Sequence, residues 1–421
     1  MGKLLSQQRR DVVIIGVGYV GRPLAIECTR AGHRVVGLDS DPTVVATLSR
    51  GAARTVAGSN SATPETSPVG FRVTGDQAVL ANADVAVICV PTPLKDGLPD
   101  LTAVRSAAEA VSTHLHHGML VVLESTTYPG TTRDVLAPIL ESSGLVAGSD
   151  FALAFSPERV DPGNLHFGIR NTPKVVGGLT PSCTKSAAEF YETLVDKVVL
   201  ARGSREAEMA KLLENTYRHV NIALVNELAR VSHELGIDFW DVLDCAATKP
   251  FGYERFVPGP GVGGHCIPID PNYLSAAVKA KLGYPLRMVE LAQDINHGMP
   301  AYVVRRIQDQ LNGQAISVRG SSVLLVGVAY KSDVDDRRES PATPIASRLQ
   351  ELGARVAYYD PHVNQWDVDG VTVSECEANE RFDIAVFLQH HSDVDPTAIV
   401  GRATTVLDTR GVLTGRNVHR L

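Results

Sequence analysis

The first half of the chain carries short, nearly continuous apolar runs, separated by longer stretches in which apolar and polar residues mix. Runs of this kind are typical of strands that are buried on both faces of a parallel sheet. The pattern predicts strands at residues 11–15, 34–39, 83–90, 118–124, 151–155, 174–178 and 197–201. The segment 49–74 is rich in Ala, Ser, Thr, Gly and Pro, which predicts a loop.

A long helix is predicted next, from the helix-starting residue Ser204 to the helix-ending Gly236. A helix of roughly 30 residues is unusually long for a single domain and can connect two lobes or supply a subunit interface. Shorter helices are predicted at 238–246, 274–282 and 299–312. The α/β pattern then returns, with apolar runs at 322–331, 355–361, 382–387 and 404–410 and a helix after Pro341.

The expected fold class is therefore α/β, with two Rossmann-like doubly wound domains joined by a central helical domain that contains one long connecting helix. We expect a first Rossmann-like domain at residues 1–203, a central helical domain at 204–312 and a second Rossmann-like domain at 313–421. Two such units suggest two nucleotide-like ligands.

The turn after the first predicted strand has the spacing GxGxxG, formed by Gly16, Gly18 and Gly21. The first glycine permits a tight turn, the second lets a pyrophosphate approach the backbone, and the third lets helix and strand pack closely. Asp39 ends the next predicted strand about 20 residues later, where an acid binds the ribose hydroxyls of NAD and repels the extra phosphate of NADP. The pattern predicts an NAD site, against the alternative of a turn that binds nothing.

Polar residues follow three of the predicted strands: Pro91 and Thr92, the segment 125–130, and the segment 156–159. Ligands of open parallel sheets bind beyond the carboxyl ends of the strands, so these segments are candidate ligand contacts.

The segment 258–271 places Cys266 and Asp270 among several glycines and prolines. Such a composition is poorly suited to helix or strand and predicts a shaped loop. A free cysteine is most often a small buried hydrophobe, but a nucleophilic thiol needs exposure and a polar partner. The glycine-proline setting favours a nucleophile.

Lys211 and Asn215 are four residues apart on the long predicted helix, so they share one face. Taken alone, a solvated lysine and a surface asparagine are the better interpretation. The histidines His114, His116 and His117, and the pair His390 and His391, are interpreted as surface residues and not as metal ligands, because no ligand partner is suitably spaced.

The net charge of −7 and the pI near 6.0 argue against nucleic acid or an acidic membrane as a partner. No apolar run approaches the roughly 18 residues of a membrane span. The polar start of the chain and six scattered cysteines favour a reduced, cytoplasmic protein.

These motifs together resemble the UDP-glucose/GDP-mannose dehydrogenase family over nearly the whole chain. The resemblance is carried by the GxGxxG turn and by the segments 125–130, 156–158, 206–215, 263–270 and 331–341. Family members oxidise the C6 hydroxymethyl group of a nucleotide sugar to a carboxylate with two NAD. The resemblance implies a homodimer, no metal, and NAD bound by the following residues: Gly16, Gly18, Tyr19, Val20, Gly21, Asp39, Pro91, Thr92, Thr127 and Arg338.

The same resemblance implies the catalytic roles. Cys266 adds to the aldehyde as a nucleophile and forms a thiohemiacetal and then a thioester. Lys211 stabilises the oxyanion or takes the alcohol proton, with Asn215 and Asp270 holding Lys211 and water, and Glu158 orients the hydrolytic water. The catalytic set is Cys266, Lys211, Asn215, Asp270, Glu158 and Thr127, and the substrate-binding set is Glu158, Arg159, Lys211, Asn215, Arg255, Phe256, Gly263, Lys331 and Arg410.

The spellings GGHCIPIDP and VDDRRESP resemble the UDP-N-acetylhexosamine branch, especially enzymes that oxidise UDP-N-acetylglucosamine. UDP-glucose, dTDP-glucose and UDP-N-acetylmannosamine remain alternatives. Two rival classes are a simpler two-electron dehydrogenase, which would need neither Cys266 nor the second α/β unit, and a catalytically silent sugar-nucleotide-binding protein. The presence of Cys266, Lys211, Asn215 and Asp270 argues against the silent protein.

Overall fold

A computed structural model describes residues 9–49, 71–95, 98–160, 164, 166–264, 267–377 and 379–421. The chain divides into two compact units. The first unit consists of Met1–Glu214 and Asn272–Tyr284, and the second consists of Asn215–Pro271 and Pro285–Leu421.

The first unit contains, among its described residues, an eight-stranded sheet in the order β10-β9-β8-β7-β4-β1-β2-β3. The strands are β1 (Asp11–Ile15), β2 (Arg34–Leu38), β3 (Arg72–Thr74), β4 (Val85–Ile88), β7 (Leu120–Leu123), β8 (Ala152–Phe155), β9 (Lys174–Gly178) and β10 (Val198–Leu200). Neighbouring strands run parallel, except that β9 runs antiparallel to β8. A two-stranded ribbon of β5 (Leu94–Lys95) and β6 (Leu98–Pro99) lies outside this sheet.

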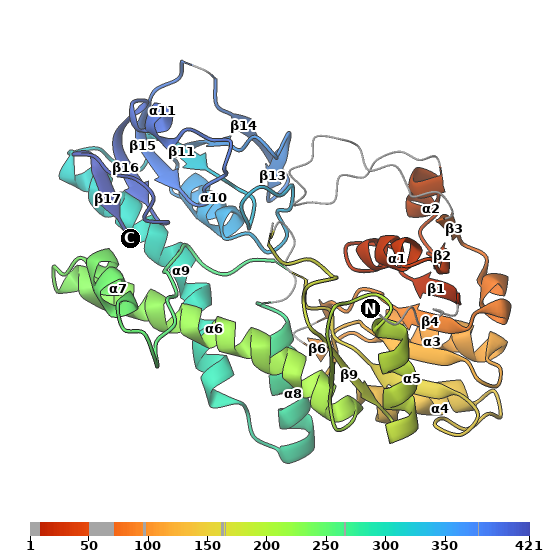
Figure 1. The fold of residues 1–421 in the computed structure, drawn as a ribbon. Coiled ribbons are helices and arrows are strands. Elements are labelled where there is room, and N and C mark those ends of the chain that lie inside the picture. The colour runs from red at the N-terminus through yellow and green to blue at the C-terminus, as the bar shows by residue number, and fades with distance from the viewer. Residues whose placement is uncertain are drawn as a thin grey trace, which may run out of the picture. The chain divides into compact units, whose positions relative to one another are not determined.

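Helices cover the first sheet because its strands are apolar on both faces. They are α1 (Gly21–Arg30), α2 (Pro42–Ser49), α3 (Thr102–His114), α4 (Ala137–Glu141), α5 (Pro181–Tyr191), the 3₁₀ helix η1 (Gln77–Asn82) and the π-helical turn η2 (Thr132–Leu136). Leu24 of α1 and Phe190 of α5 join Ile14 and Val87 of the strands in one core. Figure 1 shows α1 lying next to β1 and β2.

The second unit contains, within the described residues, a seven-stranded sheet in the order β13-β14-β12-β11-β15-β16-β17. The strands are β11 (Ser322–Val326), β12 (Arg355–Tyr359), β13 (Trp366–Val368), β14 (Val371–Glu375), β15 (Phe382–Phe387), β16 (Ala403–Asp408) and β17 (Val418–Arg420). The central strands are parallel, and β13 pairs antiparallel with β14. Helices α10 (Ala342–Glu351) and α11 (Pro396–Val400) pack on this sheet.

The helical middle of the chain consists of α6 (Ser204–Glu234), α7 (Phe239–Ala247), α8 (Asp270–Leu282) and α9 (Arg287–Gly313). The helix α6 has 31 residues and is the predicted long connecting helix. The expected fold class, two Rossmann-like α/β sheets and a helical segment, is confirmed. Among the described residues, no helix combines the length and the apolar character needed to cross a membrane.

Four details differ from the expectation. Residues 72–74 form β3 inside a segment predicted as loop; residues 50–70 of that segment lie outside the described residues. The helix α8 begins at Asp270, which was expected in a loop. The helix α9 begins at Arg287 and continues through Pro300, because a buried face runs past the proline and outweighs the lost backbone hydrogen bond. The antiparallel direction of β9 was not foreseen.

Candidate active site

The turn between β1 and α1 has the geometry that a dinucleotide phosphate requires. A methyl group at Gly21 would lie 1.9 Å from the carbonyl oxygen of Gly16, so only glycine allows this helix to approach the strand. Gly16 has φ +87°. A methyl group at Gly18 would meet no atom within 4 Å, so the space above that residue is open. The predicted glycine roles fit this geometry.

The start of α1 fits the negative charge of a pyrophosphate. Val20 is the N-cap residue and makes no side-chain cap, and the first turn contains no acid. Free backbone N–H groups at a helix start attract an anion. Tyr19 is about half exposed beside them.

Asp39 follows β2 and faces the same turn. Its carboxylate accepts hydrogen bonds from the backbone N–H of Val17 at 3.0 Å and of Asp41 at 3.0 Å. These bonds fix the carboxylate at the carboxyl edge of the sheet, where it can accept from ribose hydroxyls.

Two further cofactor candidates of the first unit lie after β4 and β7. The carbonyl of Thr92, which follows Pro91, accepts a hydrogen bond from the hydroxyl of Tyr273 at 2.8 Å. Thr127 is 1% exposed, and its hydroxyl has no hydrogen-bond partner among the described residues. A buried hydroxyl without a partner is costly, which favours a bound group as its partner.

Glu158 lies three residues beyond β8, in a network of fixed contacts. One carboxylate oxygen accepts the backbone N–H groups of Arg159 at 3.0 Å and Val160 at 2.6 Å. The other oxygen lies 3.5 Å from the ammonium group of Lys174. The backbone carbonyl of Glu158 accepts a hydrogen bond from Lys211 at 2.8 Å. The structure therefore brings together two of the predicted catalytic residues, Glu158 and Lys211.

Lys211 is 9% exposed and not solvated, so the interpretation as a surface lysine is wrong. Glu208, one turn earlier on α6, accepts hydrogen bonds from the backbone N–H groups of Gly130 and Thr132 at 2.6 and 2.8 Å. Burial raises the pKa of Glu208, and its hydrogen bonds oppose this shift. Glu208 anchors the start of α6 to the segment after β7, a role that its sequence position did not reveal.

Arg159 has its charge neutralised within the first unit. Its guanidinium group lies 2.8 Å from the carboxylate of Glu214 and donates to the carbonyl of Pro173 at 2.7 Å. Its predicted contact with the substrate stays a prediction.

In the second unit, Asn215 donates a hydrogen bond to the carboxylate of Asp270. Asp270 is 3% exposed and is the first residue of α8, where a negative charge is favourable. The predicted pair of Asn215 and Asp270 is thus in contact, and Asn215 is not a solvated surface residue. Cys266 and His265 lie outside the described residues.

Glycines of the Cys266 segment are required by close packing. A methyl group at Gly263 would lie 2.7 Å from the carbonyl of Glu339, and one at Gly264 would lie 2.7 Å from the ring of Tyr330. The N–H of Gly264 donates to the carbonyl of Arg338 at 3.1 Å. The segment therefore lies directly on the 330–339 loop after β11.

Hydrogen bonds from residues of α6 and α9 hold the start of this segment. The amide oxygen of Asn226 on α6 accepts the N–H of Gly259 at 2.9 Å, and its amide nitrogen donates to Asn296 of α9. Asn296 in turn donates to the carbonyl of His219 at 3.2 Å. Burial lowers the pKa of His219 to about 4, so this ring is neutral at pH 7.

A small cavity of the second unit contains Arg410. A methyl group at Gly259 would lie 2.9 Å from a terminal guanidinium nitrogen of Arg410. Burial lowers the pKa of Arg410, and nearby Asp408 opposes this shift. The cavity is lined by Pro260, Gly261, Ala329, Tyr330, Ser340, Pro341, Ala342, Leu388, Gln389 and Arg410. It offers one cation and several hydrogen-bonding groups at the carboxyl edge of the second sheet.

The loop after β11 also carries Lys331 and Arg338. Lys331 is half-buried. The guanidinium group of Arg338 pairs with the carboxylate of Asp336 at 2.8 and 2.5 Å. Arg338 belongs to the second unit, and its expected contact with the cofactor stays a prediction.

Arg255 and Phe256 both contact side chains of neighbouring helices. Arg255 is exposed and pairs with Asp244 at 2.7 Å. The ring of Phe256 packs edge-on against Tyr217, with centroids 5.8 Å apart. Neither contact tests the substrate-binding role expected of these two residues.

The interpretation of His391 as a surface residue is wrong. It is 1% exposed, and its Nε2 lies 3.1 Å from the carboxylate of Asp360. Its Nδ1 accepts the backbone N–H of Asp333 at 3.0 Å. Asp333, His362 and His391 bring their ligand atoms within 4.8 Å of one another. Because both nitrogens of His391 are already hydrogen-bonded, we interpret this cluster as a structural one.

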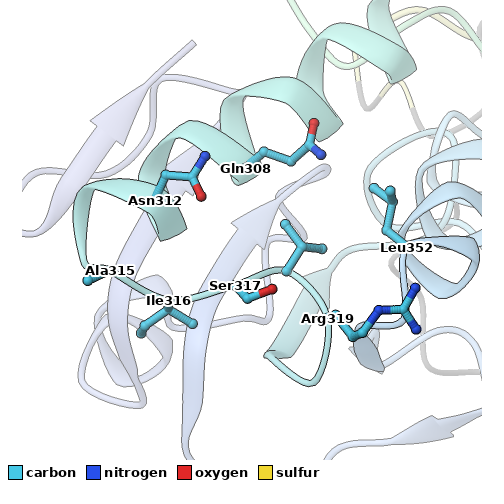
Figure 2. Close-up of a pocket in the computed structure, with 8 residues that line it drawn as sticks. Gln308, Asn312, Ala315, Ile316, Ser317, Arg319 and Leu352 are labelled. Carbon is cyan, nitrogen blue, oxygen red and sulfur yellow. The ribbon is translucent and has the colours of Figure 1, made fainter.

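A surface hollow of the second unit lies where α9 ends and the chain leads into β11 (Figure 2). Its lining consists of two amides, a serine, an arginine and apolar side chains: Gln308, Asn312, Ala315, Ile316, Ser317, Val318, Arg319 and Leu352. These groups suit no acid–base chemistry.

Comparison with known proteins gives consistent matches along the chain. Residues 10–195 match the NAD binding domain of the UDP-glucose/GDP-mannose dehydrogenase family, residues 205–298 its central domain, and residues 324–415 its UDP binding domain.

Similar proteins cover almost the full chain. A UDP-N-acetyl-D-mannosamine dehydrogenase of Methanococcus maripaludis is 32% identical over 96% of this chain and 93% of its own length. A UDP-N-acetyl-D-glucosamine 6-dehydrogenase of Pseudomonas aeruginosa is 34% identical over 91% of this chain and 90% of its own. The solved UDP-D-ManNAc dehydrogenase of Pyrococcus horikoshii superposes with a TM-score of 0.86 at 30% identity, covering 97% of this chain and 98% of that one.

Proposed function

The chain belongs to the UDP-glucose/GDP-mannose dehydrogenase family and is an NAD-dependent UDP-sugar dehydrogenase, and within this family we propose that it oxidises UDP-N-acetylglucosamine at C6 to the uronic acid. The observation that carries the proposal is that the similar proteins named above act, by their names, on UDP-N-acetylhexosamines. The spelling of the Cys266 segment favours the glucosamine form. UDP-N-acetylmannosamine is the second candidate, because two of those three names specify it.

The first oxidation would use Lys211. Its ammonium group, fixed on the carbonyl of Glu158, would stabilise the developing oxyanion or, as the free amine, take the alcohol proton. When bound, NAD would supply the hydride acceptor for each of the two oxidations. Thr127 would contribute its unsatisfied hydroxyl to the cofactor, and Asp39 its carboxylate to the ribose.

The second oxidation would need a covalent intermediate. The thiolate of Cys266 would add to the aldehyde carbon and give a thiohemiacetal, which loses a hydride to become a thioester. Asn215 and Asp270, which are hydrogen-bonded to each other, would hold the lysine and a water molecule. Water would then add to the acyl carbon with help from Glu158, and the carbon–sulfur bond would break, releasing the carboxylate and the thiolate.

The nucleotide end of the substrate would be bound by the domain that matches the UDP binding model. Lys331 would contact the substrate, and Arg410 the sugar. Arg255 and Phe256 would belong to the segment 251–261, which would cover the sugar nucleotide. Arg159 and Gly263 would contact the substrate, and Arg338 would contact a cofactor phosphate. The domain boundaries 1–203, 204–312 and 313–421, and a cytoplasmic location, also stay predictions.

A homodimer is proposed on the surface of α6. Five apolar side chains, four in its second-unit part and one directly after its last residue, are 43–67% exposed at helical spacing: Tyr217, Leu224, Leu228, Val231 and Leu235. Helical spacing places them along one stripe, and an apolar stripe of this size on a helix marks a protein interface more often than free surface.

The test is the NADH yield with excess NAD and limiting sugar nucleotide. Wells with UDP-N-acetylglucosamine, UDP-N-acetylmannosamine, UDP-glucose and dTDP-glucose are compared. We expect two NADH per sugar, formed fastest from UDP-N-acetylglucosamine. One NADH per sugar would contradict the thioester route, and faster reaction of another sugar would replace the proposed substrate.

A further inference from the structure

Lys174 is a buried cation between two carboxylates. Its side chain is 6% exposed, and its ammonium group lies 3.0 Å from Glu124 and 3.5 Å from Glu158. Glu124 has a fully buried side chain and also accepts a hydrogen bond from the hydroxyl of Tyr191. The ammonium group lies 5.2 Å from the centre of the Tyr191 ring. All four residues belong to the first unit.

The antiparallel direction of β9 explains why Lys174 is in this place. Phe155 at the end of β8 pairs with Gly177 of β9. Glu158 lies three residues after Phe155, and Lys174 lies three residues before Gly177. The same antiparallel register therefore sets Glu158 opposite Lys174. The hydroxyl of Ser156 donates to the carbonyl of Val175 at 2.8 Å and supports the same alignment. A parallel strand would have placed its first residue at the opposite edge of the sheet.

The surroundings keep Lys174 charged. Burial alone lowers the pKa of Lys174, but the carboxylates of Glu124 and Glu158 outweigh it, and the pKa lies above its ordinary value. Burial and Glu124 raise the pKa of Tyr191, which therefore donates as a neutral phenol. The other ionisable groups near Glu158 are Arg159, paired with Glu214, Lys211 on its backbone carbonyl, and the buried thiol of Cys89.

Each carboxylate oxygen of Glu158 therefore has its own hydrogen-bond partners. Within the described part of the chain, one accepts from two backbone N–H groups, and the other accepts only from Lys174. Glu124 can fix the lysine without competing for those N–H groups. The arrangement holds one carboxylate oxygen beside a cation that is itself immobilised.

We infer that Lys174, held by Glu124 and Tyr191, is a positioning residue that sets the orientation of Glu158 for hydrolysis of the thioester. The inference rests on the function proposed above. In that step water adds to the acyl carbon, its proton passes to Glu158, and the electron pair of the carbon–sulfur bond leaves with the Cys266 sulfur. Lys174 holds the Glu158 carboxylate in place before the step and does not take part in either hydride transfer.

The consequence is a separation of two rates. Without the cation, Glu158 faces Glu124 across a buried space and loses the contact that fixes one of its carboxylate oxygens. A displacement of a catalytic group by about 1 Å costs on the order of 100-fold. Release of the acid should slow by about 10- to 100-fold, while both hydride transfers continue at close to their normal rates.

The experiment compares the wild-type enzyme with Lys174→Met by stopped-flow measurement of NADH formation. The substrate is UDP-N-acetylglucosamine, or UDP-N-acetylmannosamine if only that sugar is oxidised. We expect a fast burst of two NADH per active site in the variant, followed by slow turnover. Intact-protein mass spectrometry of acid-quenched samples should show the acyl adduct accumulating.

A second variant guards against misfolding. Lys174→Met combined with Glu124→Gln removes the cation and its buried counter-charge together, so no unpaired charge remains at position 124. It should show the same burst and the same adduct.

Lys174→Arg keeps a cation and should restore release to within about tenfold of the wild type. Lys185→Met, the same change at an exposed lysine of α5, should leave both phases unchanged.

Four results would overturn the inference. Release at the wild-type rate in the double variant would show that Lys174 does not act on Glu158. Equal slowing of the burst and of release, or failure of Lys174→Arg to restore release, would assign the effect to packing. A single NADH per sugar in the wild type would remove the hydrolytic step itself, and this failure of the proposed function is visible before any variant is made.

Discussion

Asp360 of the second sheet has the same relationship to its turn as Asp39 has to the first. Asp39 follows β2 and accepts the N–H of Val17 after β1, and Asp360 follows β12 and accepts the N–H groups of Val328 and Ala329 after β11, at 2.8 and 2.9 Å. The two acids differ in exposure. Asp39 is half-buried, whereas Asp360 is 1% exposed and bonded to His391. The first acid is available to a ribose, and the second is part of the core.

Asp39→Ser should weaken NAD binding. The serine keeps a short polar side chain but loses the charge-assisted hydrogen bonds to ribose, so KM for NAD should rise about tenfold. Activity with NADP should fall less or even rise, because the repulsion of its phosphate is removed. Steady-state kinetics with both cofactors checks this, and an unchanged cofactor preference would contradict the assignment.

Asp360→Asn should destabilise the second unit and leave NAD binding alone. Burial alone raises the pKa of Asp360, but hydrogen bonds from His391 and backbone N–H groups outweigh it, so the pKa lies below its ordinary value. Replacing this buried acceptor should lower the free energy of unfolding by about 2–4 kcal/mol. Urea unfolding measures the loss, and a raised KM for NAD would argue against the separation of roles.

The pair Gly18→Ala and Gly21→Ala separates binding from folding. The methyl group at Gly18 meets no protein atom, so stability should change by less than about 0.5 kcal/mol while KM for NAD rises. The methyl group at Gly21 collides with the backbone of Gly16, which should cost about 3 kcal/mol or more. Thermal unfolding and NAD titration are measured side by side. Equal loss of stability in both variants would refute the proposed division.

His219→Gln should reduce the sensitivity of the protein to acid. The pKa of His219 is lowered to about 4 in the folded state, so below pH 6.5 the unfolded chain binds a proton that the folded chain does not. Stability should therefore fall as the pH drops from about 6.5 to about 4, with this residue contributing roughly 2 kcal/mol of the loss. The variant should lose that part of the slope, and His117→Gln, at an exposed site, should keep it.

Leu228→Lys should disrupt the proposed homodimer. Leu228 is 43% exposed in the middle of the apolar stripe of α6. A charge buried in an interface core should weaken association by at least about 100-fold. Light scattering over a dilution series measures this. Val146→Lys, at an exposed valine of the first unit, is the control. A monomeric wild type would contradict the proposal at once.

Local signals were sufficient for most of the fold. The apolar runs located the central strands of both sheets, because a strand that is buried on both faces has a nearly continuous apolar sequence. The glycine turn and Asp39 were also predictable, because their roles depend on backbone geometry within one βαβ unit. The edge strands β3, β13 and β17, and β14 beside β13, were missed, because short or exposed strands carry little pattern.

The contacts that hold the candidate site were less predictable. Lys211 and Asn215 looked like surface residues until the resemblance was considered, because burial depends on segments distant in sequence. Lys174 starts an ordinary apolar strand, and nothing in its neighbourhood marks it as the partner of Glu124 or Glu158. His391 was misread for the same reason, since its partner Asp360 lies 31 residues away.

The reversed strand β9 also sets a rule for which insertions this domain can tolerate. Glu158 and Lys174 face each other across a hairpin-like register, so residues added or removed between positions 159 and 173 leave that register intact. A single residue inserted between Lys174 and Gly177 would instead turn the lysine to the other face of the sheet. Length variation among related chains should therefore concentrate before Lys174 and be absent from the four positions that follow it.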